Sequence, residues 1–160
     1  LGEGGGAGQL VGLALEYIAM QFHNTAEASA LYEEIPAAMG KEAGINFFES
    51  VARNGLKLNE SLAPKIFELA DKQDLGALYA VKRTALQHAK DVCGIAKQLG
   101  ISDEEVTVVR AGGLHTAGNK AFDLEFENHL RDFLPNVKSV VLKEAPVIGA
   151  VKSAAGALNA

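Results

Sequence analysis

The sequence predicts an α/β fold in which a helix-rich region, about residues 8–100, precedes a strand–helix–strand–helix unit, about residues 104–160. Apolar residues recur at helical spacing through the first region, which is typical of amphipathic helices. A short run of β-branched residues then begins at Val106, and a second begins at Val137 after an amphipathic stretch. Strands that alternate with helices are typical of parallel sheets. We therefore interpret the 160 residues as one domain or a large part of one.

The first three helices are each expected from a start or stop signal. Gly8–Phe22 places its leucines and other large apolar residues along one broad face. Asn24, with Glu27 three residues later, is typical of a capping box that opens a second helix running to about Met39. A third helix follows and ends at the turn Asn54–Gly55.

Two further helices complete the helix-rich region. Either Asn59 or Ser61 is expected to cap a fourth helix, with Pro64 in its first turn, where a missing N–H costs least. The fifth and longest is expected over Leu75–Leu99, because apolar residues recur along it until Gly100 stops the helix.

The last third of the chain is expected to form a βαβα unit. Residues 105–112 and 137–143 predict buried strands, residues 117–134 an amphipathic helix between them, and the segment after Pro146 a closing helix. A βαβ unit implies parallel pairing with a right-handed crossover. Two parallel strands are not stable alone, so we expect further strands from elsewhere. Five phenylalanines are predicted to be core residues: Phe47, Phe48, Phe122, Phe126 and Phe133.

Charge and composition exclude several classes of function. The net charge is −5 and no basic run occurs, which argues against a nucleic-acid partner. Cys93 is the only cysteine, so a disulfide framework or cysteine-rich metal site is excluded within one chain, and a reducing, cytoplasmic setting is expected. The apolar stretch Pro146–Ala160 is too short to span a membrane and contains Lys152. No signal peptide is visible.

Two adjacent glycines, Gly112 and Gly113, follow the first predicted strand. Ligands of α/β proteins bind at this end of the strands, and glycine lets the backbone approach a flat or charged ligand. The alternative is a simple strand-to-helix turn. His115 is either a polar loop residue or a contact to a ribose or phosphate, and Asn119 either contacts the ligand or holds the loop. The other histidines are scattered and predict no metal site: His23, His88 and His129.

Four segments together resemble one protein family. In chain order, these segments are LGEGGGAGQLVGLAL at the start, SLAPKIFELADKQDLGALYAVKRTALQHAKDV, VVRAGGLHTAGN and APVIGAVKSAAGAL. They resemble segments in the C-terminal half of the BadF/BadG/BcrA/BcrD ATPases, which include N-acetylglucosamine kinase. The resemblance covers almost the whole chain and implies the C-terminal half of an actin-like, ribonuclease-H-like ATPase domain.

The resemblance also implies roles for individual residues. Gly112 and Gly113 are expected beside the adenosine of ATP, with Leu114 at the base. Glu3 takes the place of the aspartate that contacts a sugar hydroxyl in the family, and Gly6 and Ala7 belong to the same substrate segment. This chain departs from the family there, because glycines replace a second acid and a serine. The sugar is therefore left open.

The resemblance places the remaining catalytic parts outside this chain. The general base and three strands are expected upstream of Leu1, and ATP and Mg²⁺ are implied as cofactors. We expect no catalytic residue here, no kinase activity from this chain alone, and association with a second copy, as in a homodimer, or with the missing N-terminal half. Two alternatives are a non-catalytic, helix-rich binding or assembly module and an ATPase activator of a reductase or dehydratase. The lone Cys93 counts against the activator.

Overall fold

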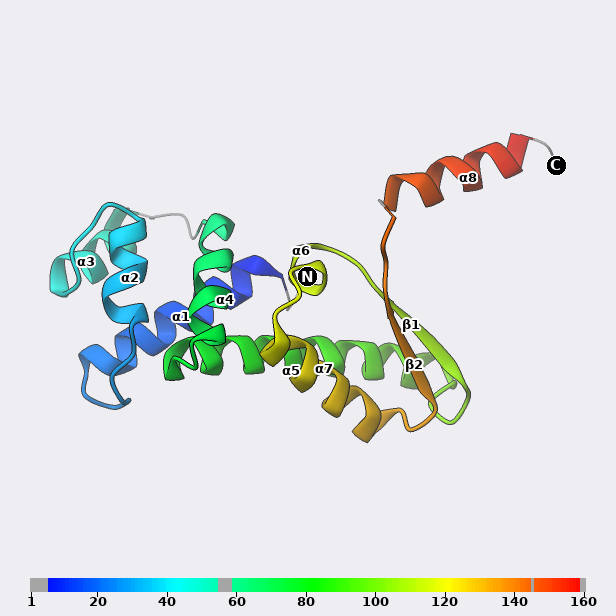
Figure 1. The fold of residues 1–160 in the computed structure, drawn as a ribbon, viewed down its shortest axis with the longest axis horizontal. Coiled ribbons are helices and arrows are strands. Elements are labelled where there is room, and N and C mark those ends of the chain that lie inside the picture. The colour runs from blue at the N-terminus through cyan, green and yellow to red at the C-terminus, as the bar shows by residue number, and fades with distance from the viewer. Residues whose placement is uncertain (1–5, 55–58, 145, 159–160) are drawn as a thin grey trace.

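The computed structural model describes residues 6–54, 59–144 and 146–158. These residues form a helix-rich chain with one small parallel sheet, as Figure 1 shows. The elements in chain order are α1 (Ala7–Phe22), α2 (Leu31–Ala38), α3 (Ile45–Asn54), the 3₁₀ turn η1 (Glu60–Leu62), α4 (Ala63–Asp71), α5 (Leu75–Leu99), β1 (Val106–Arg110), α6 (Gly113–Thr116), α7 (Lys120–Phe133), β2 (Val137–Val141) and α8 (Pro146–Leu158). None of the described helices has the length and apolar character needed to cross a bilayer.

Helix α5 is the centre of the packing, because α1, α4 and α7 all lie against it (Figure 1). The helix begins where the Asp74 side chain accepts a hydrogen bond from the Ala77 N–H at 2.9 Å, and it ends at Gly100 in the left-handed conformation. Small residues line its buried side and permit close approach. At Gly76, an added Cβ would lie 2.5 Å from Ser29 Oγ and 2.6 Å from the Tyr17 ring.

The prediction that Asn24 opens the second helix is wrong. Asn24 has a positive φ of 57°, and α2 begins only at Leu31. The helix start is held by a residue distant in sequence, since Asp74 accepts hydrogen bonds from the Ala30 N–H at 2.7 Å and from Ser29 Oγ at 2.6 Å. A tertiary contact to α5 therefore replaces the local capping box.

The start of α4 agrees with the sequence. Asn59 accepts a hydrogen bond from the Ser61 N–H at 3.0 Å and so caps η1, which leads directly into α4. Pro64 lies in the first turn of α4, where no N–H is needed. Ser61 is not the cap.

Strands β1 and β2 pair in parallel, as predicted, but they are not buried on both faces. Val108 and Val137 pack against the helical core from one face of the sheet. On the other face Val109 lies opposite Val140, and these side chains are 56% and 46% exposed. The described helices cover only one face of this sheet, so the cover expected for the other face is not supplied by the described residues.

The aromatic core is smaller than predicted. Phe47, Phe122 and Phe126 are buried, whereas Phe48 is partly buried and Phe133 is exposed at the end of α7.

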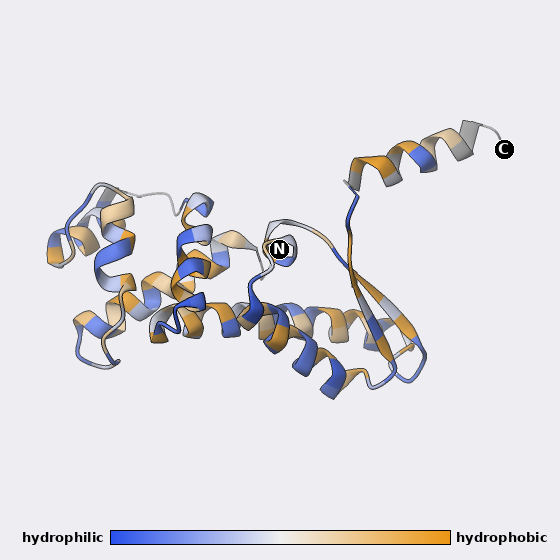
Figure 2. Cartoon of the chain, in the orientation of Figure 1, coloured by the Kyte–Doolittle hydropathy of each residue, from blue (hydrophilic) through white to orange (hydrophobic). Residues whose placement is uncertain are grey.

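Helix α8 stands apart from the other helices in Figure 1, and Figure 2 shows apolar residues along it. Its larger apolar side chains are exposed: Val147, Ile148 and Val151.

Candidate functional site

Two glycine segments far apart in the sequence line one hollow of about 840 Å³. Gly6 and Ala7 belong to the start of α1, and residues 111–114 connect β1 to α6. Figure 1 shows the start of α1 close to α6. Residues of η1 and α4 also line it. We call this the glycine hollow; its remaining described lining residues are Glu60, Ala63, Pro64, Phe67, Glu68, Asp71, His88, His115 and Ala117.

The two adjacent glycines serve different physical purposes. Gly112 has a φ of 92°, a conformation that strains any residue with a Cβ, and it caps α6. Its carbonyl accepts hydrogen bonds from the N–H and the hydroxyl of Thr116 at 3.1 and 3.0 Å. At Gly113, an added Cβ would meet no atom within 4 Å. Gly112 therefore makes the turn, and Gly113 leaves space open at the glycine hollow.

Gly6 makes a similar turn at the opposite segment. It has a φ of 123° and precedes α1, and its carbonyl accepts hydrogen bonds from the N–H groups of Gln9 and Leu10 at 3.1 and 3.2 Å. Gly6 and Ala7, at the start of α1, both line the glycine hollow. Glu3, the predicted sugar contact, lies outside the described residues.

Leu114 and Asn119 are buried. Leu114 is 7% exposed and belongs to the hydrophobic core, although it also lines the glycine hollow. Asn119 is 3% exposed and is not among the lining residues. It accepts a hydrogen bond from the Phe122 N–H at 2.9 Å, and its amide donates to the Phe67 carbonyl at 3.2 Å and to Asp71 Oδ1 at 3.0 Å. Asn119 thus fixes the start of α7 against the lining helix α4.

The structure brings together two histidines that the sequence leaves apart. Nδ1 of His88 on α5 lies 3.0 Å from Nε2 of His115 on α6, so one ring donates a hydrogen bond to the other. The His115 ring also packs edge-on against Phe122 and Phe126. His115 is therefore a half-buried packing residue, which corrects the interpretation as a polar loop residue. The contact between His88 and His115 was not predicted from the sequence.

Both imidazoles are held in the neutral state. Burial, together with nearby His88 and Arg110, lowers the pKa of His115 to about 4. Burial also lowers the pKa of His88. The pair lines both the glycine hollow and a second hollow of about 420 Å³ between α5, β1 and α7. Sequence spacing gave no signal for this pair, because only the packing of α6 on α5 joins them.

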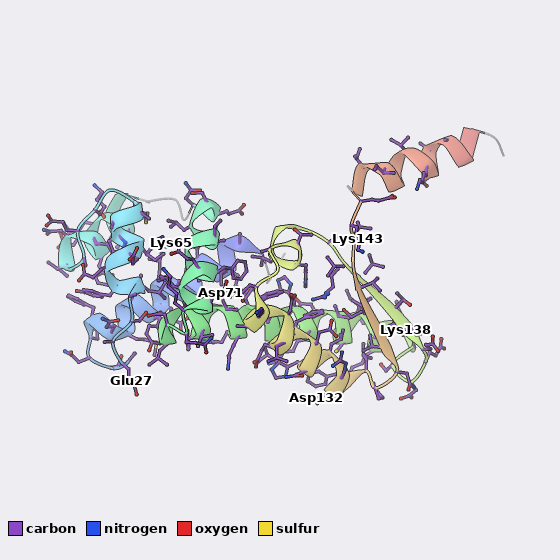
Figure 3. The ribbon with its side chains drawn as sticks, viewed as in Figure 1. Glu27, Lys65, Asp71, Asp132, Lys138 and Lys143 are labelled. Atoms are coloured by element: carbon purple, nitrogen blue, oxygen red, sulfur yellow. The ribbon has the colours of Figure 1, made fainter. Side chains whose placement is uncertain are left out.

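Three carboxylates line the glycine hollow, and no lysine or arginine is among its described lining residues. The negative charge of Glu68 is compensated by two lysines that do not line the glycine hollow, because its carboxylate lies 3.1 Å from Lys65 Nζ and 2.6 Å from Lys72 Nζ. Hydrogen bonds from these lysines lower the pKa of Glu68. Figure 3 labels Lys65 and Asp71, which both belong to α4.

The size and lining of the glycine hollow limit what it can hold. A volume of about 840 Å³ is in the range of small-molecule pockets, and glycine backbone at two sides can approach a ring or a sugar. Within the described ranges, no group of three or more histidine, cysteine, aspartate or glutamate side chains is arranged to hold a metal ion. The implied Mg²⁺ therefore has no ligand set among these residues.

A scan of protein-family models and a search of curated proteins each found no match to this chain. The likeness to the BadF/BadG/BcrA/BcrD ATPases therefore depends on the sequence motifs alone.

Proposed function

We propose that the glycine hollow binds a nucleotide, and that the chain is the nucleotide-binding C-terminal part of an ATP-dependent sugar kinase. The observation that supports this proposal best is that Gly6–Ala7 and Gly112–Gly113 line the same hollow. The motif resemblance assigns the first segment to the sugar and the second to adenosine. A kinase site needs these two ligands side by side.

The proposal assigns binding, not catalysis, to this chain. Phosphoryl transfer depends on positioning and on neutralising charge with metal ions and cationic donors. The described lining contributes carboxylates and backbone, but neither a cation nor a cluster of metal ligands. We therefore propose that the base and the metal ligands come from another part of the enzyme, and that the 160-residue chain has no kinase turnover alone.

A partner belongs to the same proposal. The exposed pair Val109 and Val140 lies on the open face of a sheet of only two strands in the described chain. Further strands or a second copy would remove this apolar surface from water.

The exposed pair also favours a second candidate function, a non-catalytic assembly module. An activator subunit has less support, because Cys93 is buried on α5. For the kinase we propose a cytoplasmic setting.

The variant Gly113→Val distinguishes two hypotheses, that the glycine pair binds a nucleotide and that it only forms a strand-to-helix turn. Gly113 has space for a Cβ and does not need a positive φ, so valine is expected to leave the helices folded while filling part of the glycine hollow. We expect affinity for adenosine and ATP, measured by calorimetry, to fall at least tenfold. Gly94→Val is the matched control, since Gly94 lies on α5 outside both hollows and also has open space.

The outcomes are distinct. Loss of binding in Gly113→Val, with an unchanged circular dichroism spectrum and normal binding by Gly94→Val, supports the nucleotide site. Equal binding by Gly113→Val and the wild type would mean that the glycine pair is only a turn, and the assembly module would then be the better account.

A further inference from the structure

Two apolar surfaces of the described chain lie uncovered, and the first is one side of α8. Val147, Ile148 and Val151 are exposed, at 63%, 40% and 62% of their surface. Residues at positions i, i+1 and i+4 of a helix share one side. Ser153 lies on the other side, because two residues correspond to about 200° around the helix axis. The helix is therefore amphipathic, although it stands apart from the other helices (Figure 1).

The second surface is the open face of the sheet. Thr107 and Val109 of β1 lie opposite Lys138 and Val140 of β2, and all four residues are exposed. The residues between them point to the other face, which packs against the helical core. A parallel sheet is expected to have cover on both faces. The described residues supply that cover on one face only.

The two surfaces match in size. Five residues of a strand span about 17 Å, and two neighbouring strands are about 10 Å wide. A helix of 13 residues is about 20 Å long and about 10 Å across. One helix laid along the strands would therefore cover the open face. Figure 1 shows that α8 continues away from the end of β2, so the two surfaces do not meet within one chain.

We propose that α8 of a second copy of this chain packs on the open face of the sheet, and that the exchange is reciprocal, which gives a symmetric dimer. A second copy fits better than an unrelated protein, because it carries both complementary surfaces and one symmetric arrangement covers all of them. This inference goes beyond the proposed nucleotide site, since none of these residues lines the glycine hollow.

The size of the contact predicts a weak dimer. Each docked helix is expected to cover roughly 250 Å² of the sheet and to lose about as much of its own exposed surface. Two reciprocal contacts therefore bury roughly 1,000 Å², which is near the lower limit for a specific interface.

Sedimentation velocity over a concentration series measures this dimer. Val151→Asp places a charge in the middle of the apolar side of α8, and Val140→Asp places one on the open face of the sheet. Each variant is expected to weaken the dimer at least tenfold, because the aspartate would be buried without a partner. Ser153→Asp is the matched control, since it adds the same charge on the other side of α8, and it is expected to stay within twofold of the wild type. Circular dichroism spectra equal to that of the wild type show that the variants are folded.

Mixing the two weakened variants tests the reciprocal exchange. In a mixed pair, α8 of the Val140→Asp chain meets the open face of the Val151→Asp chain, and neither of these surfaces carries a substitution. One of the two contacts is then intact. The mixture is therefore expected to contain more dimer than either variant alone at the same total concentration.

The results that support the inference and those that overturn it are distinct. A dimer that both aspartate variants weaken, that Ser153→Asp retains and that mixing partly restores supports the exchange. A wild-type chain that stays monomeric throughout the series overturns it. A dimer that either Val140→Asp or Val151→Asp leaves unchanged, or a mixture with no more dimer than its components, also overturns it.

Discussion

Replacing Asn119 tests how the glycine hollow is held in shape. Its side chain caps α7 through the Phe122 N–H and also reaches α4, where it donates to the Phe67 carbonyl and to Asp71. Phe67 and Asp71 both line the glycine hollow. Asn119→Ala therefore removes the helix cap and the bridge between two elements of the site in one step.

The structure sets the size of the effect. Loss of an N-cap costs about 1 kcal/mol. The amide also loses its hydrogen bonds to the Phe67 carbonyl and to Asp71, which contribute about 0.5–1.5 kcal/mol each. We expect Asn119→Ala to lower the free energy of unfolding by about 2–4 kcal/mol in total. Asn119→Ser, which keeps a capping oxygen but not the amide donors, is expected to cost about 1–3 kcal/mol.

Urea unfolding followed by circular dichroism measures these differences. Asn136→Ala is the matched control, because the Asn136 amide also donates to a backbone carbonyl, that of Asp103, but in an exposed position. We expect that control to cost less than about 0.5 kcal/mol. A cost of Asn119→Ala equal to that of Asn136→Ala would refute the reasoning, since it would show that the buried hydrogen bonds do not join α4 to α7.

Two further predictions concern other parts of the chain. Gly76→Ala is expected to lower the free energy of unfolding by about 1–3 kcal/mol, because its Cβ would overlap Ser29 and Tyr17; an unchanged urea midpoint would contradict this packing. The pKa of His115 is about 4 in the folded chain and has its ordinary value of 6.5 in the unfolded chain, so the unfolded chain binds this proton more readily. The contribution of His115 to the free energy of unfolding is therefore complete above pH 6.5 and is lost as the pH falls toward 4. His115→Asn is expected to show a shallower loss of stability over that interval, and slopes equal to the wild type would show that His115 is not held neutral.

Much of the fold could be predicted from local signals. The bounds of α5 follow from its apolar spacing and from Gly100, and the parallel pairing of β1 with β2 follows from the amphipathic helix between them. The start of α2 could not be predicted, because Asp74 holds it from another helix. The sequence also could not show which face of the sheet the helices leave uncovered, because the apolar pattern around Val109 and Val140 predicts burial but does not identify the covering element.

The candidate site was predicted in part. The glycine segments were identified from sequence, and the structure shows that both line one hollow. Asn119 was identified as a residue that holds the loop or touches the ligand, and its burial and hydrogen bonds give it the first role. The pair His88–His115 and the lining acid Glu60 were missed, because each depends on which helices meet in three dimensions.

The central claim, that the two glycine segments line one ligand site with adenosine at Gly112 and Gly113 and the sugar beside it at Gly6 and Ala7, is tested most directly by residue-resolved NMR. Amide signals of a ¹⁵N-labelled chain would be followed while adenosine is added. We expect the amides of residues 6–8 and 111–115 to shift together along saturation curves with one shared Kd. Shifts confined to residues 6–8, or absent from both segments, would contradict the claim that adenosine binds at residues 112–113 in a site that both segments line.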